Sequence, residues 1–451
     1  MRRSPTQPAG RRLFANHTLQ RNARRLRPPN QRMKILLTLR QPLFPADTGG
    51  KVRSWNIFSR LAKRASIHAV SFAEPVSDAA SICEMQSVFQ SYTPVFWQET
   101  KKYSPRFYKE LVANQFRSLP YFLAKCSLPD FRTAVEHLLA NEQFDLLFCD
   151  FLHTAVPLLE CTFKPKIVFE HNVEFQLRKR KWQVEKHPLR RIAFGSEWRR
   201  TRPLEARVCR LFDQVLTVSE EDRQMIHQEF RIDHVSTLPT GVDTDFFHPS
   251  ANRTRPGRLV FVGSMDWDPN EDGVVWFLEN IYPLVRNAAP NASFVVVGRN
   301  PSSRLQAIAA KTPSMELTGW VPDVRPYLSQ AEVVVVPLRI GGGTRIKIPE
   351  AMAMAKAVVS TPIGAEGLPF QDDKQIRIAR HPQDFAQTVV QLLENASLRD
   401  AIGNAARKEV AVNHSWEAVL RKVEEVLDRV VSNGNQSFVD TSVSQPALVI
   451  P

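Results

Sequence analysis

The stretch GGGTRIKIPE at residues 341–350 combines residue types that together could bind a phosphate group. Its three glycines leave backbone amides open to a ligand, because no Cβ stands in the way. Arg345 and Lys347 add two positive charges, and an arginine can contact two phosphate oxygens at once. Pro349 lacks an amide hydrogen, so a helix that begins around it keeps both cations in the loop or the first turn. The N-terminus of that helix adds partial positive charge, and the stretch therefore indicates an anion-binding turn.

The carboxylate of Glu350 lies in the same turn and requires a different partner. It would repel a phosphate, but a carboxylate is suited to accept hydrogen bonds from the hydroxyls of a ribose. Cations for a diphosphate and a carboxylate for a ribose together indicate a nucleoside diphosphate. The stretch lacks the G-x-x-x-x-G-K-[ST] spacing of an ATPase phosphate loop. The simpler interpretation is a surface loop with solvated cations, in which Glu350 only favours the helix dipole.

Short apolar runs alternate with helical patterns on both sides of a Pro- and Gly-rich segment at residues 241–257. Before it the clearest runs include 35–39, 67–72, 144–150 and 166–172, and after it they include RLVFVGS, ASFVVVGR, AEVVVVPL and KAVVST. Strands that alternate with helices form parallel βαβ units, so the predicted fold class is α/β with two Rossmann-like domains. Parallel sheets bind ligands at the carboxyl ends of their strands, and two facing sheets can hold one substrate each across a cleft. The predicted division is an N-terminal domain at 33–240, a linker at 241–257, a second domain at 258–412 and an amphipathic helix at 413–433.

The ends of the 451-residue chain differ from these domains in composition. Residues 1–32 hold nine arginines and no acidic residue, and they account for most of the net charge of +14. Such a segment cannot bury enough apolar surface to fold, so 1–32 and the polar residues 434–451 are predicted to be disordered. The basic segment has no apolar core of a secretory signal. It could be an arm for nucleic acid or for a membrane surface, and Met33, which opens the first strand, is an alternative start.

The cysteines and the hydropathy pattern bear on metal sites and on location. The five cysteines form neither an even set nor a pair with metal-finger spacing, which favours reduced thiols in a cytoplasmic protein. No His-Glu-x-x-His motif is present, and no metal is expected. No apolar run approaches the length of a membrane-spanning helix, so contact with a membrane would be peripheral, on its inner face.

The segment PLRIGGGTRIKIPEAMAMAKAVVST, followed by GAEGL, resembles the donor-binding segment of glycosyltransferase family 4, whose members are retaining enzymes of the GT-B fold. The resemblance extends from Met33 to the last helix. It implies a nucleoside diphosphate sugar as donor, no cofactor, and a C-terminal helix that crosses back to the N-terminal, acceptor-binding domain. The family commonly carries two glutamates with seven residues between them, and Glu350 matches the second, which contacts the ribose. The first falls at Gly342, so the sugar hydroxyls must meet backbone amides of residues 341–344 or another group.

The resemblance also implies roles for residues outside this segment. His171, at the carboxyl end of a strand, would act with Arg345 and Lys347 at the reacting centre, where the cations stabilise the leaving diphosphate. Val321 would read the nucleobase through its backbone. The neighbouring Trp320 is expected to pack against the domain, and stacking on the base is the alternative. The remaining residues expected to bind the donor are Gly49, Gly50, Gly263, Gly342, Gly343, Thr344 and Glu350.

These observations predict a bacterial transferase that moves a sugar from a nucleoside diphosphate to a hydroxyl of a glycan or lipid-linked acceptor. Its expected place is the synthesis of a cell-surface polysaccharide or glycolipid. A sugar-nucleotide epimerase can share the two-domain fold, but it would need paired acid and base groups, and no second group is evident. A basic nucleic-acid-binding protein is the third hypothesis. It rests on residues 1–32 alone, since no RNA-binding or zinc motif appears, and no nucleic acid is expected as a partner.

Overall fold

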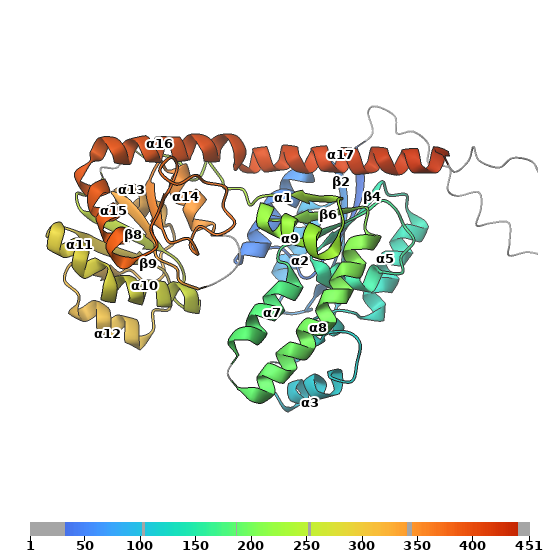
Figure 1. Ribbon diagram of the computed structural model, residues 1–451. Helices are drawn as coiled ribbons and strands as arrows, with labels where there is room; N and C mark the ends of the chain where they lie inside the picture. Colours follow the sequence, from blue (N-terminus) through green and yellow to red (C-terminus); the bar gives the residue numbers. More distant parts are fainter. Residues whose placement is uncertain (1–31, 102–103, 186, 251–253, 341–344, 441–451) are drawn as a thin grey trace, which may run out of the picture.

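The computed structural model describes residues 32–101, 104–185, 187–250, 254–340 and 345–440, which form two α/β domains (Figure 1). The first domain holds a seven-stranded sheet in the order β3-β2-β1-β4-β5-β6-β7. The second holds a six-stranded sheet in the order β10-β9-β8-β11-β12-β13. All strand pairs in both sheets are parallel, which confirms the predicted pair of Rossmann-like sheets.

The strands of the N-terminal sheet are short and mostly apolar because helices cover both faces of a parallel sheet. Leu37 of the first strand lies between Ala69 and Phe148 of its two neighbours, and all three side chains are buried. The strands are β1 (Lys34–Leu39), β2 (Ser66–Ala73), β3 (Ser91–Phe96), β4 (Leu146–Asp150), β5 (Lys166–Glu170), β6 (Gln214–Thr217) and β7 (Val235–Thr237).

The helices of this domain follow the strands, and several begin where the sequence provides a cap. Ser219 accepts a hydrogen bond from the amide of Asp222 at 3.1 Å and so caps the N-terminus of α9. The elements are α1 (Gly49–Leu61), α2 (Ala79–Val88), α3 (Pro105–Asn114), α4 (Tyr121–Ala124), α5 (Pro129–Asn141), α6 (Leu152–Ala155), the 3₁₀ turn η1 (Val156–Leu158), α7 (Glu174–Val184), α8 (Pro188–Leu211) and α9 (Glu220–Phe230).

The C-terminal domain repeats the pattern around a second core. Its strands are β8 (Arg258–Val262), β9 (Ser293–Val297), β10 (Met315–Leu317), β11 (Val333–Val336), β12 (Ala357–Ser360) and β13 (Arg377–Ile378). Its helices are α10 (Asp268–Asn280), α11 (Tyr282–Ala288), α12 (Ser303–Lys311), α13 (Arg325–Gln330), α14 (Lys347–Ala353), α15 (Pro382–Glu394) and α16 (Ala396–Asn413). The carboxyl ends of β8 and β11 lead directly to the turns that carry Gly263 and Lys347.

The last helix, α17 (Trp416–Asp440), leaves the C-terminal domain and runs along the N-terminal one (Figure 1). Trp416, Leu420 and Val423 belong to the same buried cluster as Phe58 and Leu61 of α1. This confirms the predicted crossing back. The helix continues past residue 433, where the sequence predicts a tail, because the polar residues that follow extend its backbone hydrogen bonds. The predicted tails at 1–32 and 441–451 lie outside the described residues, apart from Arg32.

Candidate functional site

The turn between β11 and α14 is only partly described. Gly342, Gly343 and Thr344 lie outside the described residues, so their predicted contacts stay predictions. The description resumes at Arg345, whose side chain is buried and donates a hydrogen bond to the carbonyl of Ile363 at 3.2 Å. Burial lowers the pKa of Arg345, and the nearby Glu366 opposes this shift.

Lys347, the first residue of α14, lies at a junction of three elements. Its Nζ donates to Oδ1 of Asn270 on α10 at 2.7 Å and lies 4.1 Å from the ring centroid of Phe261 on β8. An ammonium over an aromatic face is attracted by the ring quadrupole. Burial, followed by the charge of Arg345, lowers the pKa of Lys347 to about 7. The protonation state of Lys347 near neutral pH therefore depends on the charge of the group that binds next to it.

Gly263 explains how the lysine reaches this junction. A Cβ at this position would lie 2.6 Å from Nζ of Lys347 and 2.7 Å from Nδ2 of Asn270. Any side chain here would therefore displace the ammonium from its place. The sequence predicts that Gly263 lies near the donor but does not reveal the role of Asn270, which aligns the lysine and also donates to the carbonyl of Ser264 at 2.8 Å.

The carboxylate of Glu350 lies one turn further along α14 and is partly exposed. Burial raises its pKa to about 7, although Lys347 favours the ionised form. Within the residues that the structure describes, no side chain or amide donates a hydrogen bond to this carboxylate. A ligand hydroxyl could therefore use both of its oxygens.

The N-terminal domain brings its glycine turn to the same place. Gly49 and Gly50 are the first residues of α1. A Cβ on Gly49 would lie 3.9 Å from Cδ1 of Ile346, directly before α14. A Cβ on Gly50 would lie 2.9 Å from the ring of Phe151, so a side chain there would collide with it. Gly49 thus lies against the residue before α14 of the other domain, whereas Gly50 lies against Phe151 of its own domain.

His171 follows β5, at the carboxyl end of the strand as predicted, but its ring belongs to a buried network. Its Nε2 lies 2.8 Å from Oδ1 of Asp150, and its Nδ1 lies 2.9 Å from a guanidinium nitrogen of Arg53. An arginine can only donate, so Nδ1 must accept and Nε2 must carry the hydrogen that Asp150 receives. Burial lowers the pKa of His171, which keeps the ring neutral.

This network limits the role of His171. Both ring nitrogens already bind protein groups, the ring stacks on Phe151 at a centroid distance of 3.8 Å, and the side chain is 2% exposed. In this arrangement the ring has no free nitrogen for a sugar, and its catalytic role stays a prediction. No pattern in the sequence indicates that Arg53 is the partner of His171. The signal that was available for Asp150 was its position at the carboxyl end of the run FDLLFCD.

A pocket lies between the domains beside this network. It is lined from the N-terminal domain by residues of α7, including Gln176 and Arg180, and from the other domain by Pro349, Glu366 and Gly367. Arg180 and Glu366 form an ion pair of 3.5 Å across the two domains. The pocket therefore opens between the predicted donor site and α7.

The turn after β10 differs from expectation in one respect. Val321 is partly buried and packs against the C-terminal core. Its backbone contact with the nucleobase stays a prediction. The expectation that Trp320 packs is wrong, because the side chain is 71% exposed. Gly319 before it has a φ of +68°, a left-handed conformation that glycine adopts readily.

Two family models match the two domains of the chain. The chain matches the model "Glycosyltransferase Family 4" over residues 93–246 and the model "Glycosyl transferases group 1" over residues 256–395. These two matches together cover more than half of the chain. The protein belongs to this family of GT-B glycosyltransferases. It is therefore an enzyme that transfers sugars.

Curated relatives are distant. The chain is 22% identical over 295 residues to an uncharacterized 44.6 kDa protein in the cps region of Klebsiella pneumoniae, with 62% of this chain and 72% of the relative covered. It is 24% identical over 239 residues to one subunit of the phosphatidylinositol N-acetylglucosaminyltransferase of Arabidopsis thaliana, with 51% and 52% covered. An uncharacterized glycosyltransferase of Methanocaldococcus jannaschii is 22% identical, with 48% and 55% covered. The chain thus spans about half the length of the last two.

Solved structures share the fold over most of the chain. The sucrose-phosphate synthase of Thermosynechococcus elongatus has a TM-score of 0.63 at 16% identity, with 89% of this chain and 100% of that chain covered. A glycosyltransferase from Rickettsia africae has a TM-score of 0.62 at 14% identity, with 89% and 99% covered. The Anabaena protein HepE, in complex with UDP and glucose, has a TM-score of 0.57 at 13% identity, with 88% and 100% covered. At these identities the similarity shows the fold.

Proposed function

We propose that the protein is a retaining glycosyltransferase that moves a sugar from a nucleoside diphosphate sugar to an acceptor hydroxyl. The observation that carries the proposal is the position of the Lys347 ammonium. It lies at the N-terminal end of α14, against Gly263, on the side of the domain that Gly49 faces. This geometry supports a diphosphate at Lys347, a ribose at Glu350 and a sugar near the turn that carries Gly49 and Gly50.

The proposed chemistry is electrostatic. As the bond between the sugar C1 and the diphosphate oxygen breaks, negative charge grows on the diphosphate, and Lys347, Arg345 and the helix terminus stabilise it. The acceptor hydroxyl attacks from the face that the diphosphate leaves, so the anomeric configuration is retained. No cofactor takes part. An epimerase and a nucleic-acid-binding protein are not favoured by the family matches.

For the acceptor we propose a glycan or a lipid-linked glycan that binds to the N-terminal domain, in the synthesis of a cell-surface polysaccharide or glycolipid. Three relatives support this choice by their own descriptions. One lies in the cps region of Klebsiella pneumoniae, and another belongs to a phosphatidylinositol N-acetylglucosaminyltransferase. The third, a TarM mutant of S. aureus with a TM-score of 0.57, was solved with fondaparinux, α-GlcNAc-glycerol and UDP. We place the protein in the cytoplasm. No helix in the described ranges is long and apolar enough to cross a bilayer.

The proposed function is tested by calorimetry with a panel of nucleoside diphosphate sugars that vary in base and sugar. One member of the panel should bind, and the same member should be consumed when an acceptor is added. Binding of free nucleotides alone, with no preference for any sugar, would count against a transferase site. A product with inverted anomeric configuration would leave transfer standing but overturn the retaining mechanism.

Donor binding and transfer should not need a divalent metal. The cations Lys347 and Arg345 and the start of α14 supply positive charge for the diphosphate. In addition, the described residues contain no group of three or more His, Cys, Asp or Glu that could hold a metal ion. Transfer rates measured with EDTA should equal those measured with added Mg²⁺ or Mn²⁺. Activity that EDTA abolishes and Mn²⁺ restores would show that a metal neutralises the diphosphate instead.

Donor binding should take up protons at mildly alkaline pH. With a pKa of about 7, Lys347 is mostly neutral at about pH 8, and a diphosphate next to it raises that pKa because it favours the charged form. Glu350, also with a pKa of about 7, is already ionised there. Calorimetry in two buffers of different ionisation enthalpy should therefore show an uptake approaching one proton. The Lys347→Met variant should lose it, and equal heats in both buffers for the unchanged protein would contradict the assignment.

A further inference from the structure

At one end of the N-terminal domain, α3 and the first turns of α8 lie close together in Figure 1, and Arg200 of α8 bonds the segment that follows α3. Apolar side chains are exposed on α3, just after it and on the first turns of α8. We call this surface the α3–α8 tip. The exposed fractions are 51% for Tyr108, 62% for Val112, 90% for Phe116, 71% for Leu189 and 70% for Ile192. Exposed apolar residues that stand singly are ordinary, but a cluster of this kind marks an interaction surface.

The spacing of these residues places them on outward faces. Tyr108, Val112 and Phe116 are four positions apart, so they form one stripe along α3 and its continuation. Leu189 and Ile192 are three positions apart on one face of α8. The opposite face of α3 holds the buried Asn114, which packs toward the domain. The stripe of α3 is therefore not used by the fold.

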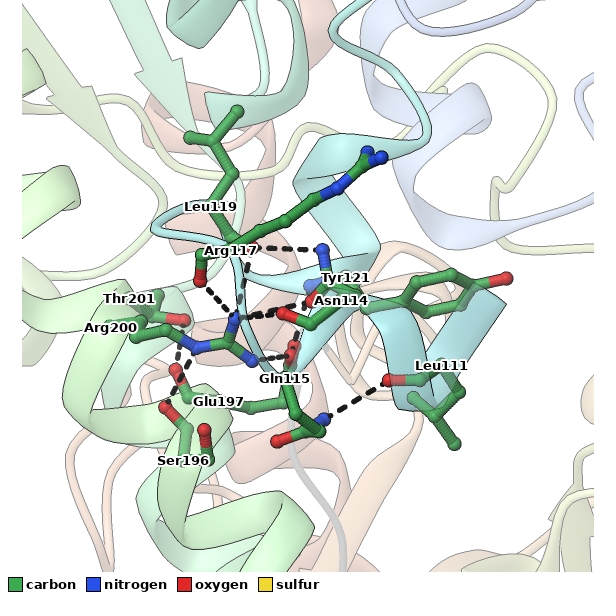
Figure 2. Close-up of polar contacts among 10 residues, drawn as sticks. All are labelled: Leu111, Asn114, Gln115, Arg117, Leu119, Tyr121, Ser196, Glu197, Arg200 and Thr201. Atoms are coloured by element: carbon green, nitrogen blue, oxygen red, sulfur yellow. Dashed lines mark hydrogen bonds and ion pairs between the residues drawn. The ribbon is translucent and has the colours of Figure 1, made fainter. Parts of the chain in front are cut away.

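Figure 2 shows how the segment after α3 is held against α8. A guanidinium nitrogen of Arg200 donates to the carbonyl oxygens of Asn114 and Arg117 at 2.7 Å each and of Leu119 at 3.2 Å. Its other terminal nitrogen pairs with Glu197 at 2.8 Å, and Glu197 also accepts the first amide of α4 at 2.9 Å. These contacts, between positions more than eighty residues apart, fix the backbone on both sides of Phe116. The apolar stripe is thus presented from a rigid support.

The charged residues of the tip are unbalanced. Its two carboxylates are already paired, Glu110 with Arg106 at 2.9 Å and Glu197 with Arg200. Five further exposed cations of these segments form no ion pair within the described part of the chain: Lys109, Arg117, Arg190, Arg191 and Arg199. On a helical surface, apolar side chains interleaved with cations match an anionic bilayer, where the apolar groups enter the headgroup boundary and the cations meet phosphates.

The tip is also connected to the pocket between the domains. Gln176, Leu177 and Arg180 of α7 line that pocket, and α7 then runs toward the turn into α8. At 1.5 Å per residue the helix is about 16 Å long. A bilayer at the tip would therefore hold a lipid-linked acceptor within reach of the pocket.

We propose that the α3–α8 tip docks the protein on an anionic lipid bilayer. Docking on a bilayer would bring the enzyme to a lipid-linked acceptor, so this inference rests on the acceptor class in the proposed function. Its test needs neither donor nor acceptor, so it can fail while sugar transfer stands, and the reverse also holds.

The test is sedimentation of the full chain with vesicles of pure phosphatidylcholine and with vesicles of two parts phosphatidylcholine to one part phosphatidylglycerol. The protein should bind the anionic vesicles and should be released by salt, because screening weakens attraction to a charged surface. Equal binding to both vesicle types would overturn the charge argument. No binding to either would overturn the proposal.

Variants locate the surface. The double variant Phe116→Ser and Ile192→Ser removes two exposed apolar groups and should weaken binding by at least about tenfold. Arg190→Glu and Arg199→Glu should each weaken it roughly fivefold or more. The matched control is Val412→Ser, 57% exposed on α16 of the other domain, which should bind like the unchanged chain. Binding that the tip variants leave intact would show that another part of the chain docks, and the proposal would be wrong.

Discussion

The Lys347→Ala variant should lose most of its turnover, and its loss of donor affinity should be the smaller effect. The ammonium stabilises charge that grows on the diphosphate as the sugar leaves, so it contributes more in the transition state than in the ground state. A charge-assisted hydrogen bond is worth about 1.5 to 3 kcal/mol, which corresponds to a roughly 10- to 150-fold lower kcat. Arg345→Ala should act in the same direction. Steady-state kinetics with the donor varied measures the effect.

The matched control for these variants is Arg339→Ala. Arg339 also follows β11, but its guanidinium is paired with the carboxylate of Asp272 on α10. It should keep its kcat, and all variants should melt close to the unchanged protein. If Lys347→Ala and Arg345→Ala kept a normal kcat at saturating donor, the start of α14 would not be the leaving-group site.

The Glu350→Ala variant should show the opposite kinetic pattern. The carboxylate is proposed to hold the ribose, which is far from the breaking bond and is bound equally in the ground and transition states. Its loss should therefore raise the donor KM by roughly 10- to 150-fold and leave kcat nearly unchanged. The Glu350→Gln variant keeps one acceptor oxygen, so its donor KM should lie between those of the unchanged protein and Glu350→Ala. A strong drop in kcat with an unchanged KM would place Glu350 at the reacting centre instead of at the ribose.

The strands and the edge of the sheet that carries the chemistry could be predicted because they depend on local patterns. Apolar runs such as AEVVVVPL must be buried strands, and the glycines and cations after them must lie at the carboxyl end of the sheet. The resemblance to the family assigned Gly263, the residue after β8, to the donor site. Its actual contact, which excludes any Cβ beside the Lys347 ammonium, joins residues more than eighty positions apart. The sequence indicates that Gly263 and Lys347 both lie at the carboxyl end of the C-terminal sheet, but not that they are in contact.

Other features depend on contacts that no local pattern indicates. The tautomer of His171 follows from Arg53, which lies more than a hundred residues away. The exposure of Trp320, which follows the left-handed residue Gly319, is not indicated by the residue types alone. The α3–α8 tip could not be predicted from the sequence because the helical stripe at 108–116 is also typical of a buried helix. The exposed fractions of these side chains and the contacts of Arg200 show which face points outward.

The central claim is that the diphosphate of the donor binds at Lys347, and a crystal structure with the donor selected by the panel tests it most directly. Phosphate oxygens are expected within hydrogen-bond distance of Nζ of Lys347, and a ribose is expected at the carboxylate of Glu350. The structure offers a different cavity of about 570 Å³ on the same domain, lined by Asp266, Glu271, Trp276 and Arg304 among others. A nucleotide found there, with Lys347 still bound only to Asn270, would contradict the claim.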